Sequence, residues 1–344
     1  MRAIKHKITL LSVSVSLAAA TLFAAPVQAA DAFVPAVIYD VGGKFDKSFN
    51  QAAYTGAEKF KKETGVKYLE GQINADIEGE QILRHMARKG ASIIFVTGFQ
   101  QQGQVSKIAP QFPKVKFVLV NVAPTTPLPN VLSMMFREEE GSFLAGMAAS
   151  MASKSGKVGF IGGMDIPLIS RFGCGYAQGA QYANPKATIV SNMVGSTAAA
   201  FRDPTRGAEL AISQFDRGVD VVFAAAGNTG TGVIQAAKDK GKLAIGVDSN
   251  QNYVHPGTVL TSMVKQVDNA VYQAFKSAQA GTWKPGVVTL GLKDQGVMLA
   301  IDQHNRKLIT PQMEAKLNQA KADIIAGKIK VHDYTTNNSC PVKL

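Results

Sequence analysis

The chain of 344 residues is poor in several features that mark particular classes of protein. It has two cysteines and one tryptophan, and only 18% of its residues are charged. Its mean hydropathy of +0.03 is too low for a protein with many membrane spans. Hydrophobic residues nevertheless make up 46% of the chain, which excludes a disordered or collagen-like protein and predicts a packed core. The length allows two or three domains, or one unit with two lobes.

The signature motifs of common enzymes are also absent from the sequence. It contains no G-x-S-x-G, no H-E-x-x-H, no Walker A motif, and no G-x-G-x-x-G after a predicted strand. The histidines beyond residue 30 stand singly, without the spacing of metal ligands. They are His85, His255, His304 and His332. We therefore expect a protein that is not an enzyme and that holds no metal and no cofactor.

Residues 1–30 carry the pattern of a secretory signal peptide. A basic start, an apolar stretch over residues 8–25 and small residues before a cleavage point follow one another. The basic residues are Arg2, Lys5 and Lys7. The alternative is a retained anchor helix, because about eighteen apolar residues nearly span a bilayer. No cysteine lies in this segment, so we expect a mature chain that begins at Ala30 or Asp31, lies in the periplasm and has no lipid anchor.

The positive charge of the chain does not predict a nucleic-acid partner. Lys and Arg number 37 against 25 Asp and Glu, and loss of the three basic leader residues lowers the net charge from +12 to +9. The remaining basic residues form no run of five and are not interleaved with aromatic residues as in proteins that stack bases. We interpret the charge as a dispersed, solvated surface.

The two cysteines, Cys174 and Cys340, both lie in the exported part of the chain. In an oxidising compartment this pair predicts one disulfide that ties the C-terminal tail back to the second half of the chain. The alternative is two free thiols too far apart to meet.

Apolar strand-like runs alternate with helical patterns along the chain. The predicted strands are 36–39, 92–96, 117–120, 131–135, 158–161, 188–193, 220–224 and 243–247, and the predicted helices include 48–62, 138–153, 169–183, 204–214 and 230–238. This alternation predicts parallel sheets with helices on both faces, in two halves of about 100–120 residues. Ligands of such sheets bind beyond the carboxyl ends of the strands. The residues at those ends are Asp40, Asn121, Gly162, Gly163, Met164, Gly227, Asn228 and Asp248.

The segment from Asp46 to Asn50 follows the first predicted strand. Ser48 is expected to cap the next helix. Phe49 is then either a core residue or an aromatic surface at the cleft, where Asn50 could form hydrogen bonds. The glycine-rich segment 227–232 opens a helix and could hold a polar oxygen with its backbone N–H groups, although a tight strand-to-helix turn explains it equally well.

Several segments resemble the basic-membrane-protein family of bacterial solute-binding proteins, which includes purine nucleoside receptors of ABC importers. The segments are 46–51 (DKSFNQ), 143–146 (FLAG), 160–164 (FIGGM), 225–230 (AAGNTG), 246–251 (GVDSNQ) and 261–265 (TSMVK). The resemblance implies a type I periplasmic-binding fold of class α/β, with two doubly wound, Rossmann-like lobes joined by a hinge. The first lobe is expected over 31–137 plus about 262–283, and the second over 138–261 plus about 284–344.

The resemblance also implies a nucleoside site. Phe49 and Phe201 match the positions that sandwich the purine, with Phe172 as the alternative to Phe201. Asp248 and Lys265 match positions that hold ribose hydroxyls. Asp40 and Asn50 match positions at which polar side chains of the family contact the ligand. Three positions depart from the family pattern. Relatives commonly have Asp where this chain has Asn121, Gly where it has Asn228, and Asp where it has Asn250.

The resemblance implies a receptor, expected to be a monomer, that binds a purine nucleoside or a related heteroaromatic solute, such as a flavin, and delivers it to ABC permease subunits. A sensory protein for a similar solute and a secreted enzyme acting on nucleosides are the alternatives. A carboxylate only accepts hydrogen bonds, whereas an amide both accepts and donates. Asn121 therefore leaves the preferred base open.

Overall fold

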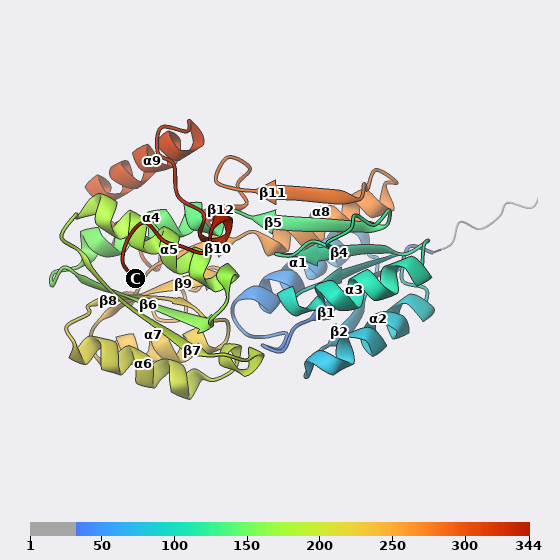
Figure 1. Ribbon diagram of the computed structural model, residues 1–344, viewed down its shortest axis with the longest axis horizontal. Helices are drawn as coiled ribbons and strands as arrows, with labels where there is room; N and C mark the ends of the chain where they lie inside the picture. The colour runs from blue at the N-terminus through green and yellow to red at the C-terminus, as the bar shows by residue number, and fades with distance from the viewer. Residues whose placement is uncertain (1–31) are drawn as a thin grey trace, which may run out of the picture. The chain divides into compact units, whose positions relative to one another are not determined.

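We describe residues 32–344 from a computed structural model (Figure 1). The predicted signal peptide lies outside these residues. Within them the strands form two six-stranded sheets, each flanked by helices on both faces. Neighbouring strands are parallel in both sheets, except that β10 and β12 are antiparallel.

The first lobe contains the sheet of strand order β11-β5-β4-β3-β1-β2. Its strands are β1 (Pro35–Tyr39), β2 (Leu69–Gln72), β3 (Ile93–Val96), β4 (Lys116–Val120), β5 (Val131–Phe136) and β11 (Gly286–Leu290). Its helices are α1 (Phe49–Thr64), α2 (Gly79–Arg88), α3 (Gln102–Ile108) and α8 (Val267–Gln279). The central strands are buried on both faces, which explains their continuous apolar sequences.

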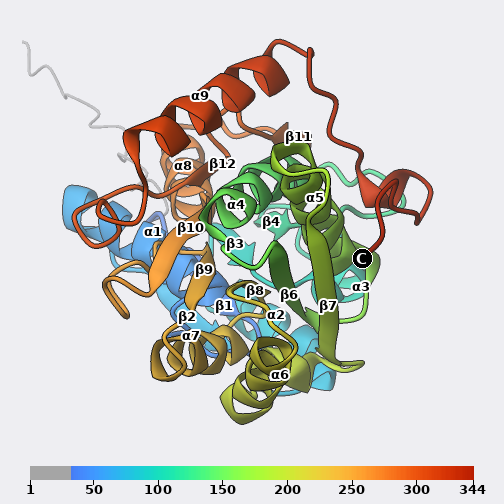
Figure 2. The same ribbon diagram turned by 90° about the vertical axis from the view of Figure 1, so that its left-hand side faces the viewer.

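The second lobe contains the sheet of strand order β12-β10-β9-β8-β6-β7. Its strands are β6 (Lys157–Met164), β7 (Thr188–Gly195), β8 (Val221–Ala225), β9 (Leu243–Asp248), β10 (Val259–Lys265) and β12 (Val297–Leu299). Its helices are α4 (Glu138–Ala152), α5 (Pro167–Ala183), α6 (Pro204–Asp216), α7 (Thr229–Asp239) and α9 (Pro311–Ile325). Figure 2 shows α4 and α5 on one face of this sheet and α6 and α7 on the other.

Helices α4 and α5 pack backbone to backbone. A Cβ atom added at Gly146 would lie 1.9 Å from the carbonyl oxygen of Tyr176, and one added at Gly179 would lie 1.8 Å from that of Phe143. Only glycine permits such an approach, because any side chain would overlap the facing backbone. This packing fixes α5 firmly at the side of the cleft between the lobes.

The chain crosses between the lobes three times. The crossings follow β5, β10 and β11, and they are hydrogen-bonded to one another. Arg137 N donates to Leu290 O at 3.0 Å, and Gln266 N donates to Gly296 O at 2.9 Å. The Glu140 carboxylate accepts a further bond from Leu292 N at 2.8 Å. The three crossings therefore form one hinge.

The expected lobe boundaries shift at two places. Strand β10 runs without a break to Lys265 in the second sheet, so residues 262–265 belong to the second lobe and not to the first. Strand β11, residues 286–290, pairs with β5 and so belongs to the first lobe. The patterns did not predict β2, β10, β11 or β12. Strands β2 and β11 lack a run of buried apolar residues, β12 has only three residues, and Thr261 and Ser262 interrupt the apolar run of β10.

Cys174 on α5 and Cys340 in the C-terminal tail are joined by a disulfide across 166 residues of sequence, with their Cα atoms 5.6 Å apart. Between the end of α9 and Cys340 the tail passes along α5 and contains the short 3₁₀ helix η5 (Tyr334–Thr336). The last segment of the chain is thus fastened to a helix that borders the cleft.

Candidate functional site

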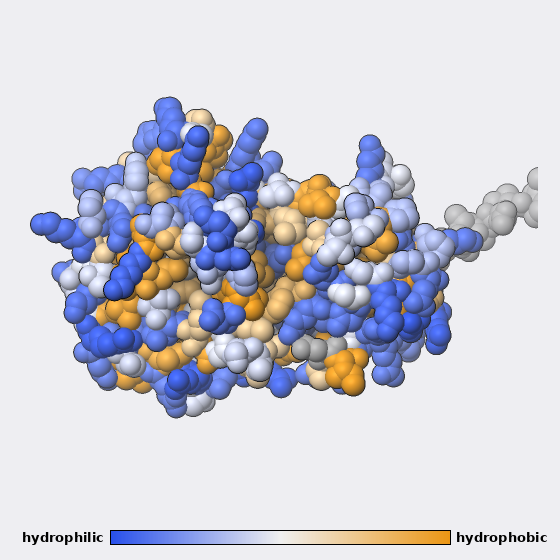
Figure 3. Space-filling view, viewed as in Figure 1, coloured by the Kyte–Doolittle hydropathy of each residue, from blue (hydrophilic) through white to orange (hydrophobic). Residues whose placement is uncertain are grey.

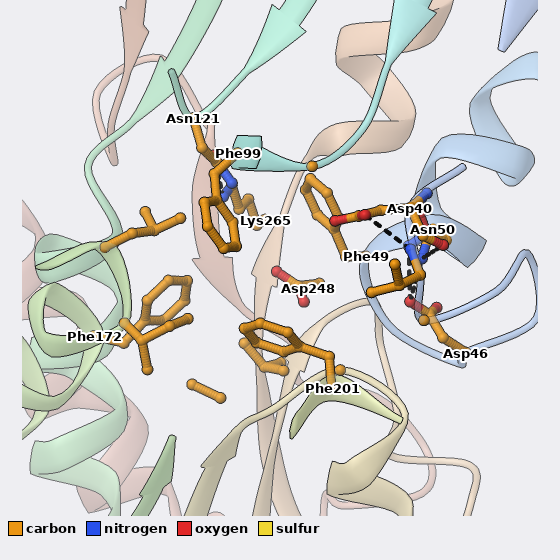
Figure 4. Close-up of a pocket in the computed structure, with 18 residues that line it drawn as sticks. Asp40, Asp46, Phe49, Asn50, Phe99, Asn121, Phe172, Phe201, Asp248 and Lys265 are labelled. Carbon is orange, nitrogen blue, oxygen red and sulfur yellow. Dashed lines mark hydrogen bonds between the residues drawn. The ribbon is translucent and has the colours of Figure 1, made fainter. Parts of the chain in front are cut away.

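The carboxyl ends of strands from both sheets meet at a cleft between the lobes (Figure 4). The cleft holds about 630 Å³ of space not filled by protein atoms, including the part open to solvent. Its polar lining residues are Asp40, Asp46, Asn50, Asn121, Asp248 and Lys265. The rule that ligands bind beyond the carboxyl ends of strands therefore predicted three of these six residues, Asp40, Asn121 and Asp248.

Four phenylalanine rings line the cleft, from both lobes. Phe49 begins α1 and Phe99 follows β3, while Phe172 lies on α5 and Phe201 ends the 3₁₀ helix η4 (Ala198–Phe201). The rings of Phe99 and Phe201 approach edge to face across the cleft, with centroids 6.5 Å apart. Leu168 and Ile169 extend this apolar wall, and Figure 3 shows apolar side chains gathered between the two lobes on one face of the molecule.

The sequence patterns do not predict Phe99 as a site residue, although its position after a strand is a signal that could have placed it at the cleft. Strand β3 ends at Val96, and Phe99 follows after only two residues. Both Phe172 and Phe201 line the cleft, so the expected choice between them does not arise.

Asp46 caps helix α1, and the prediction that Ser48 does so is wrong. The Asp46 carboxylate accepts hydrogen bonds from the backbone N–H groups of Ser48 at 2.8 Å, Asn50 at 3.0 Å and Gln51 at 3.0 Å. Ser48 makes no side-chain cap bond. Burial raises the pKa of Asp46 to about 6, against the lowering effect of these N–H donors. Because Asp46 provides the cap, the Ser48 hydroxyl is available for another partner.

That partner is Asp248 in the opposite lobe. The Ser48 hydroxyl donates to Asp248 Oδ2 at 2.6 Å. Two more bonds join the same segments, since Ser249 Oγ donates to Ser48 O at 2.7 Å and Gln251 Nε2 donates to Lys47 O at 2.9 Å. We call these three bonds the interlobe latch. They connect the loop before α1 directly to the loop after β9.

The backbone is strained at three positions around the cleft. Lys47, Asn121 and Asp248 have φ values of 59°, 70° and 62°, in the left-handed region that residues other than glycine rarely occupy. Such conformations gather at functional sites, where surrounding contacts hold them. Burial also raises the pKa of Asp248, while the charge of Lys265 and the hydrogen bond from Ser48 lower it.

Asn50 lines the cleft but is bound by protein groups. Its Oδ1 atom accepts from Asp40 N at 2.9 Å and Thr97 Oγ1 at 2.8 Å, and its Nδ2 atom donates to Asp46 Oδ2 at 3.1 Å. These bonds hold the loop between β1 and α1. The structure thus gives Asn50 a clear role in shaping the first-lobe wall.

Lys265 is a buried cation at the end of β10, with 1% of its surface exposed. Its ammonium group donates to Asn121 Oδ1, and to Glu138 Oε1 at 2.7 Å. It also lies 5.3 Å, 5.0 Å and 5.8 Å from three phenylalanine ring centroids, those of Phe49, Phe136 and Phe172. The sequence patterns do not predict Glu138 as part of the site, because its partner Lys265 lies 127 residues away in sequence.

Gly227 and Asn228 both follow β8, but only one of them lines the cleft. Gly227 lines the cleft and has a φ of +56°. Asn228 is not among the residues that line it, contrary to expectation. At Asn228 the chain has already turned into α7, and its carbonyl oxygen accepts from Thr231 Oγ1 at 2.8 Å and Thr231 N at 2.9 Å. Asn250 likewise lies away from this cleft and donates to Asp302 at 2.7 Å.

Over residues 32–344, no helix combines the length and apolar character needed to cross a bilayer. The same residues contain no group of three or more His, Cys, Asp or Glu side chains placed to hold a metal ion. What they do present at the cleft is an aromatic wall around Asp248 and Lys265.

Solved structures of the same architecture support the predicted fold. A solute-binding protein of an ABC transporter system from Aeropyrum pernix is 30% identical, covers 88% of this chain and 94% of its own, and superposes with a TM-score of 0.81. A sugar-binding protein of a sugar ABC transporter from Bacillus halodurans has a TM-score of 0.60 at 13% identity, covering 80% of this chain and 99% of its own. The second likeness concerns the fold alone. Together they confirm the type I periplasmic-binding fold.

Sequence relatives cover most of the chain. An ABC transporter nucleoside-binding protein, BmpA, of Lactococcus lactis is 33% identical over 318 residues, which are 86% of this chain and 88% of the relative. An uncharacterized lipoprotein of Pyrococcus horikoshii is 36% identical over 274 residues, which are 76% of this chain and 67% of the relative. The family model for PnrA-like ABC transporter substrate-binding proteins matches residues 33–335. The chain therefore belongs to the PnrA-like family of ABC transporter substrate-binding proteins, which are receptors and not enzymes.

Proposed function

We propose that the protein binds a purine nucleoside in the interlobe cleft and delivers it to the permease of an ABC importer. The observation that carries the proposal is the aromatic wall of four phenylalanines around the Asp248 and Lys265 side chains. Flat rings stack on aromatic side chains, and each stacked base is worth about 1–3 kcal/mol. The name of the Lactococcus lactis relative, a nucleoside-binding protein, agrees with this chemistry.

The sugar is the second half of the proposed ligand. Asp248 lines the cleft and holds only one described side-chain hydrogen bond, to Ser48. A carboxylate has about four acceptor positions, so Asp248 can accept from vicinal hydroxyls while it keeps the latch. Lys265 lies behind the same space and donates from its remaining N–H.

Asn121 determines which hydrogen-bonding groups the protein offers to the base. Its Oδ1 atom accepts from Lys265, which leaves the amide N–H groups to face a ligand. The complementary group on the ligand is an acceptor, such as a ring nitrogen or a carbonyl oxygen. An aspartate at this position would instead require a donor on the base.

We further propose that residues 1–30 export the protein to the periplasm and that it works there without a lipid anchor, as a monomer. The leader pattern and its lack of cysteine support this, whereas the Pyrococcus horikoshii relative is named a lipoprotein. Mass spectrometry of the protein recovered from a periplasmic extract would show a free amine near Ala30. A membrane-bound or acylated product would contradict the proposal.

Calorimetric titration tests the ligand. The protein is unfolded in guanidinium, refolded to remove carried-over ligand, and titrated with inosine, guanosine, adenosine, the free bases and riboflavin. We expect nucleosides to bind to the wild type. We expect Phe201→Ala to weaken nucleoside binding about tenfold or more, because one stacking surface is lost. Phe45→Ala is the matched control, since Phe45 is 66% exposed and does not line the cleft.

Asp248→Asn separates the sugar from the base. The substitution should weaken nucleoside binding by at least about tenfold, because a hydrogen bond to a charged group contributes about 1.5–3 kcal/mol. It should leave the affinity for a free base nearly unchanged. Absence of nucleoside binding by the wild type, or equal binding by Phe201→Ala, would refute the proposal. Preferential binding of riboflavin would show that the ligand is a flavin and not a nucleoside.

A further inference from the structure

One stripe of helix α5 faces the C-terminal tail. Arg171, Cys174 and Gln178 follow one another at helical spacing, and each is bound to the tail. Gln178 exchanges two hydrogen bonds with the backbone of His332, at 2.9 Å and 3.0 Å. A neighbouring stripe of α5, with Ile169 and Phe172, lines the cleft. The tail and the cleft therefore lie on two sides of one helix.

Arg171 connects the tail to the hinge. Its guanidinium donates from Nε to Asp333 Oδ1 at 2.8 Å and from Nη2 to Thr335 Oγ1 at 2.6 Å. Its Nη1 atom donates to Phe136 O at 3.1 Å and to Glu138 Oε2 at 2.9 Å. The planar guanidinium is thus fixed on one side by the tail and on the other by the first crossing between the lobes.

Glu138 carries the connection onward to the cleft. It is fully buried, its Oε2 atom accepts from Arg171, and its Oε1 atom accepts from Lys265 at 2.7 Å. Two cations, Arg171 and Lys265, thus meet two carboxylates, Glu138 and Asp333, in an unbroken chain of hydrogen-bonded charges. Removal of one buried partner leaves another charge uncompensated, which a buried network does not tolerate without rearrangement.

We propose that the tail segment 331–340 is a positioning element of the ligand site: through Asp333 and Thr335 it fixes Arg171, Arg171 fixes Glu138, and Glu138 holds Lys265 against the cleft. The Cys174–Cys340 disulfide keeps this segment on α5. The inference rests on the proposed nucleoside-binding function for its effect on affinity. Asp333, Thr335, Arg171 and Glu138 are positioning residues and are not among those that line the cleft.

Asp333→Asn is the principal test, because it removes the charge and keeps the shape of the side chain. Its matched control is Asp323→Asn, which removes a carboxylate bound to Lys328 and Gln319 at the end of α9, away from the network. A second variant, Thr335→Val, removes the hydroxyl that accepts from Arg171 Nη2 and donates to Asp333 Oδ1. Thr335→Val tests the same connection if Asp333→Asn fails to fold.

Two measurements are made on each variant after removal of carried-over ligand. The first is the calorimetric dissociation constant for the best-binding nucleoside. The second is the NMR signal of the Lys265 side-chain ammonium in protein labelled with ¹⁵N-lysine, assigned by its loss in Lys265→Arg. The second needs no ligand, so it reports on Lys265 whether or not a nucleoside binds.

We expect Asp333→Asn and Thr335→Val to move the Lys265 signal and to weaken nucleoside binding about tenfold, as loss of an outer-shell partner does for metal ligands. Asp323→Asn should change neither. If the wild type binds no nucleoside but the signal moves, the proposed function fails and the positioning role stands. An unmoved Lys265 signal in both network variants, or affinity losses equal to those of Asp323→Asn, would overturn the inference.

Discussion

Replacing Asp46 with alanine removes the carboxylate that organises the first-lobe side of the cleft. Four donors would lose their acceptor: the backbone N–H groups of Ser48, Asn50 and Gln51, and the side-chain amide of Asn50. Asp46 is 2% exposed, so water replaces these bonds poorly. The perturbation therefore acts on the loop that carries both Phe49 and the Ser48 side of the interlobe latch.

The structure sets the magnitude of this effect. A hydrogen bond contributes about 1 kcal/mol net, which would give about 4 kcal/mol for four, and loss of a helix cap alone costs about 0.5–2 kcal/mol. Burial raises the pKa of Asp46 to about 6, and the cost of ionising it at pH 7.5 offsets part of that gain. We therefore expect the alanine variant to lose about 2 kcal/mol of unfolding free energy, and Asp46→Asn, which keeps one acceptor oxygen, about half as much.

Urea unfolding at pH 7.5, followed by circular dichroism, measures these differences. Asp165→Ala is the control, because Asp165 is exposed and its side chain makes none of the described hydrogen bonds. Nucleoside affinity should fall together with stability in Asp46→Ala, since Phe49 follows the cap directly. An alanine variant within about 0.5 kcal/mol of the wild type would show that Asp46 does not hold the start of α1.

Three further outcomes are expected. The double variant Cys174→Ser, Cys340→Ser should lose about 5 kcal/mol of unfolding free energy in the chain-entropy model, because the disulfide closes a loop of 166 residues; an unchanged urea midpoint would contradict this. Burial, followed by the charge of a neighbouring carboxylate, raises the pKa of Glu139 from 4.5 to about 8, so the folded state keeps a proton that the unfolded state releases. Wild-type stability should then fall between pH 4.5 and 8 by up to about 1.4 kcal/mol per pH unit from this group, and Glu139→Gln should lack that part of the slope; equal slopes would speak against it. A Cβ atom at Gly163 would lie 2.3 Å from Phe201 Cε1, so Gly163→Ala should displace that ring and weaken nucleoside binding about tenfold, and unaltered calorimetric affinity would refute it.

Gly103→Ala is the matched control for the glycine substitution. Gly103 lies in α3, and a Cβ atom there would meet nothing within 4 Å. It should leave nucleoside affinity unchanged and stabilise the protein slightly, because alanine is the better helix former.

Much of the fold follows from local pattern. The central strands β1, β3, β4 and β8 are short apolar runs because both faces of each sheet are covered, and such runs are visible in sequence. Strands β2 and β11 are not visible in this way, since they are partly or largely exposed and lack that signature. Strand β10 is buried, but Thr261 and Ser262 interrupt its apolar run, and it is not predicted either. The expected lobe boundary, after residue 261, lies a few residues before the observed one at Lys265 for a related reason. Where a strand ends and a hinge begins depends on which neighbour it pairs with.

The expected site shows the same division. Asp40, Asn121, Gly227 and Asp248 were found because they follow strands, and position in a parallel sheet suffices to place them at the cleft. Local pattern favoured Ser48 as the cap of α1, since serine is a good capping residue. Only the fold shows that Asp46 takes this place and that Ser48 reaches the opposite lobe instead.

The sequence by itself thus determined the alternation of strands and helices, the edge at which polar residues collect, and the family to which the chain belongs. The tertiary structure decided which of those residues act together. The bond between Ser48 and Asp248 spans 200 residues, that between Lys265 and Glu138 spans 127, and that between Arg171 and Asp333 spans 162. Contacts so distant in the chain leave no periodic trace in it, because they depend on how two complete lobes and a tail come together in space.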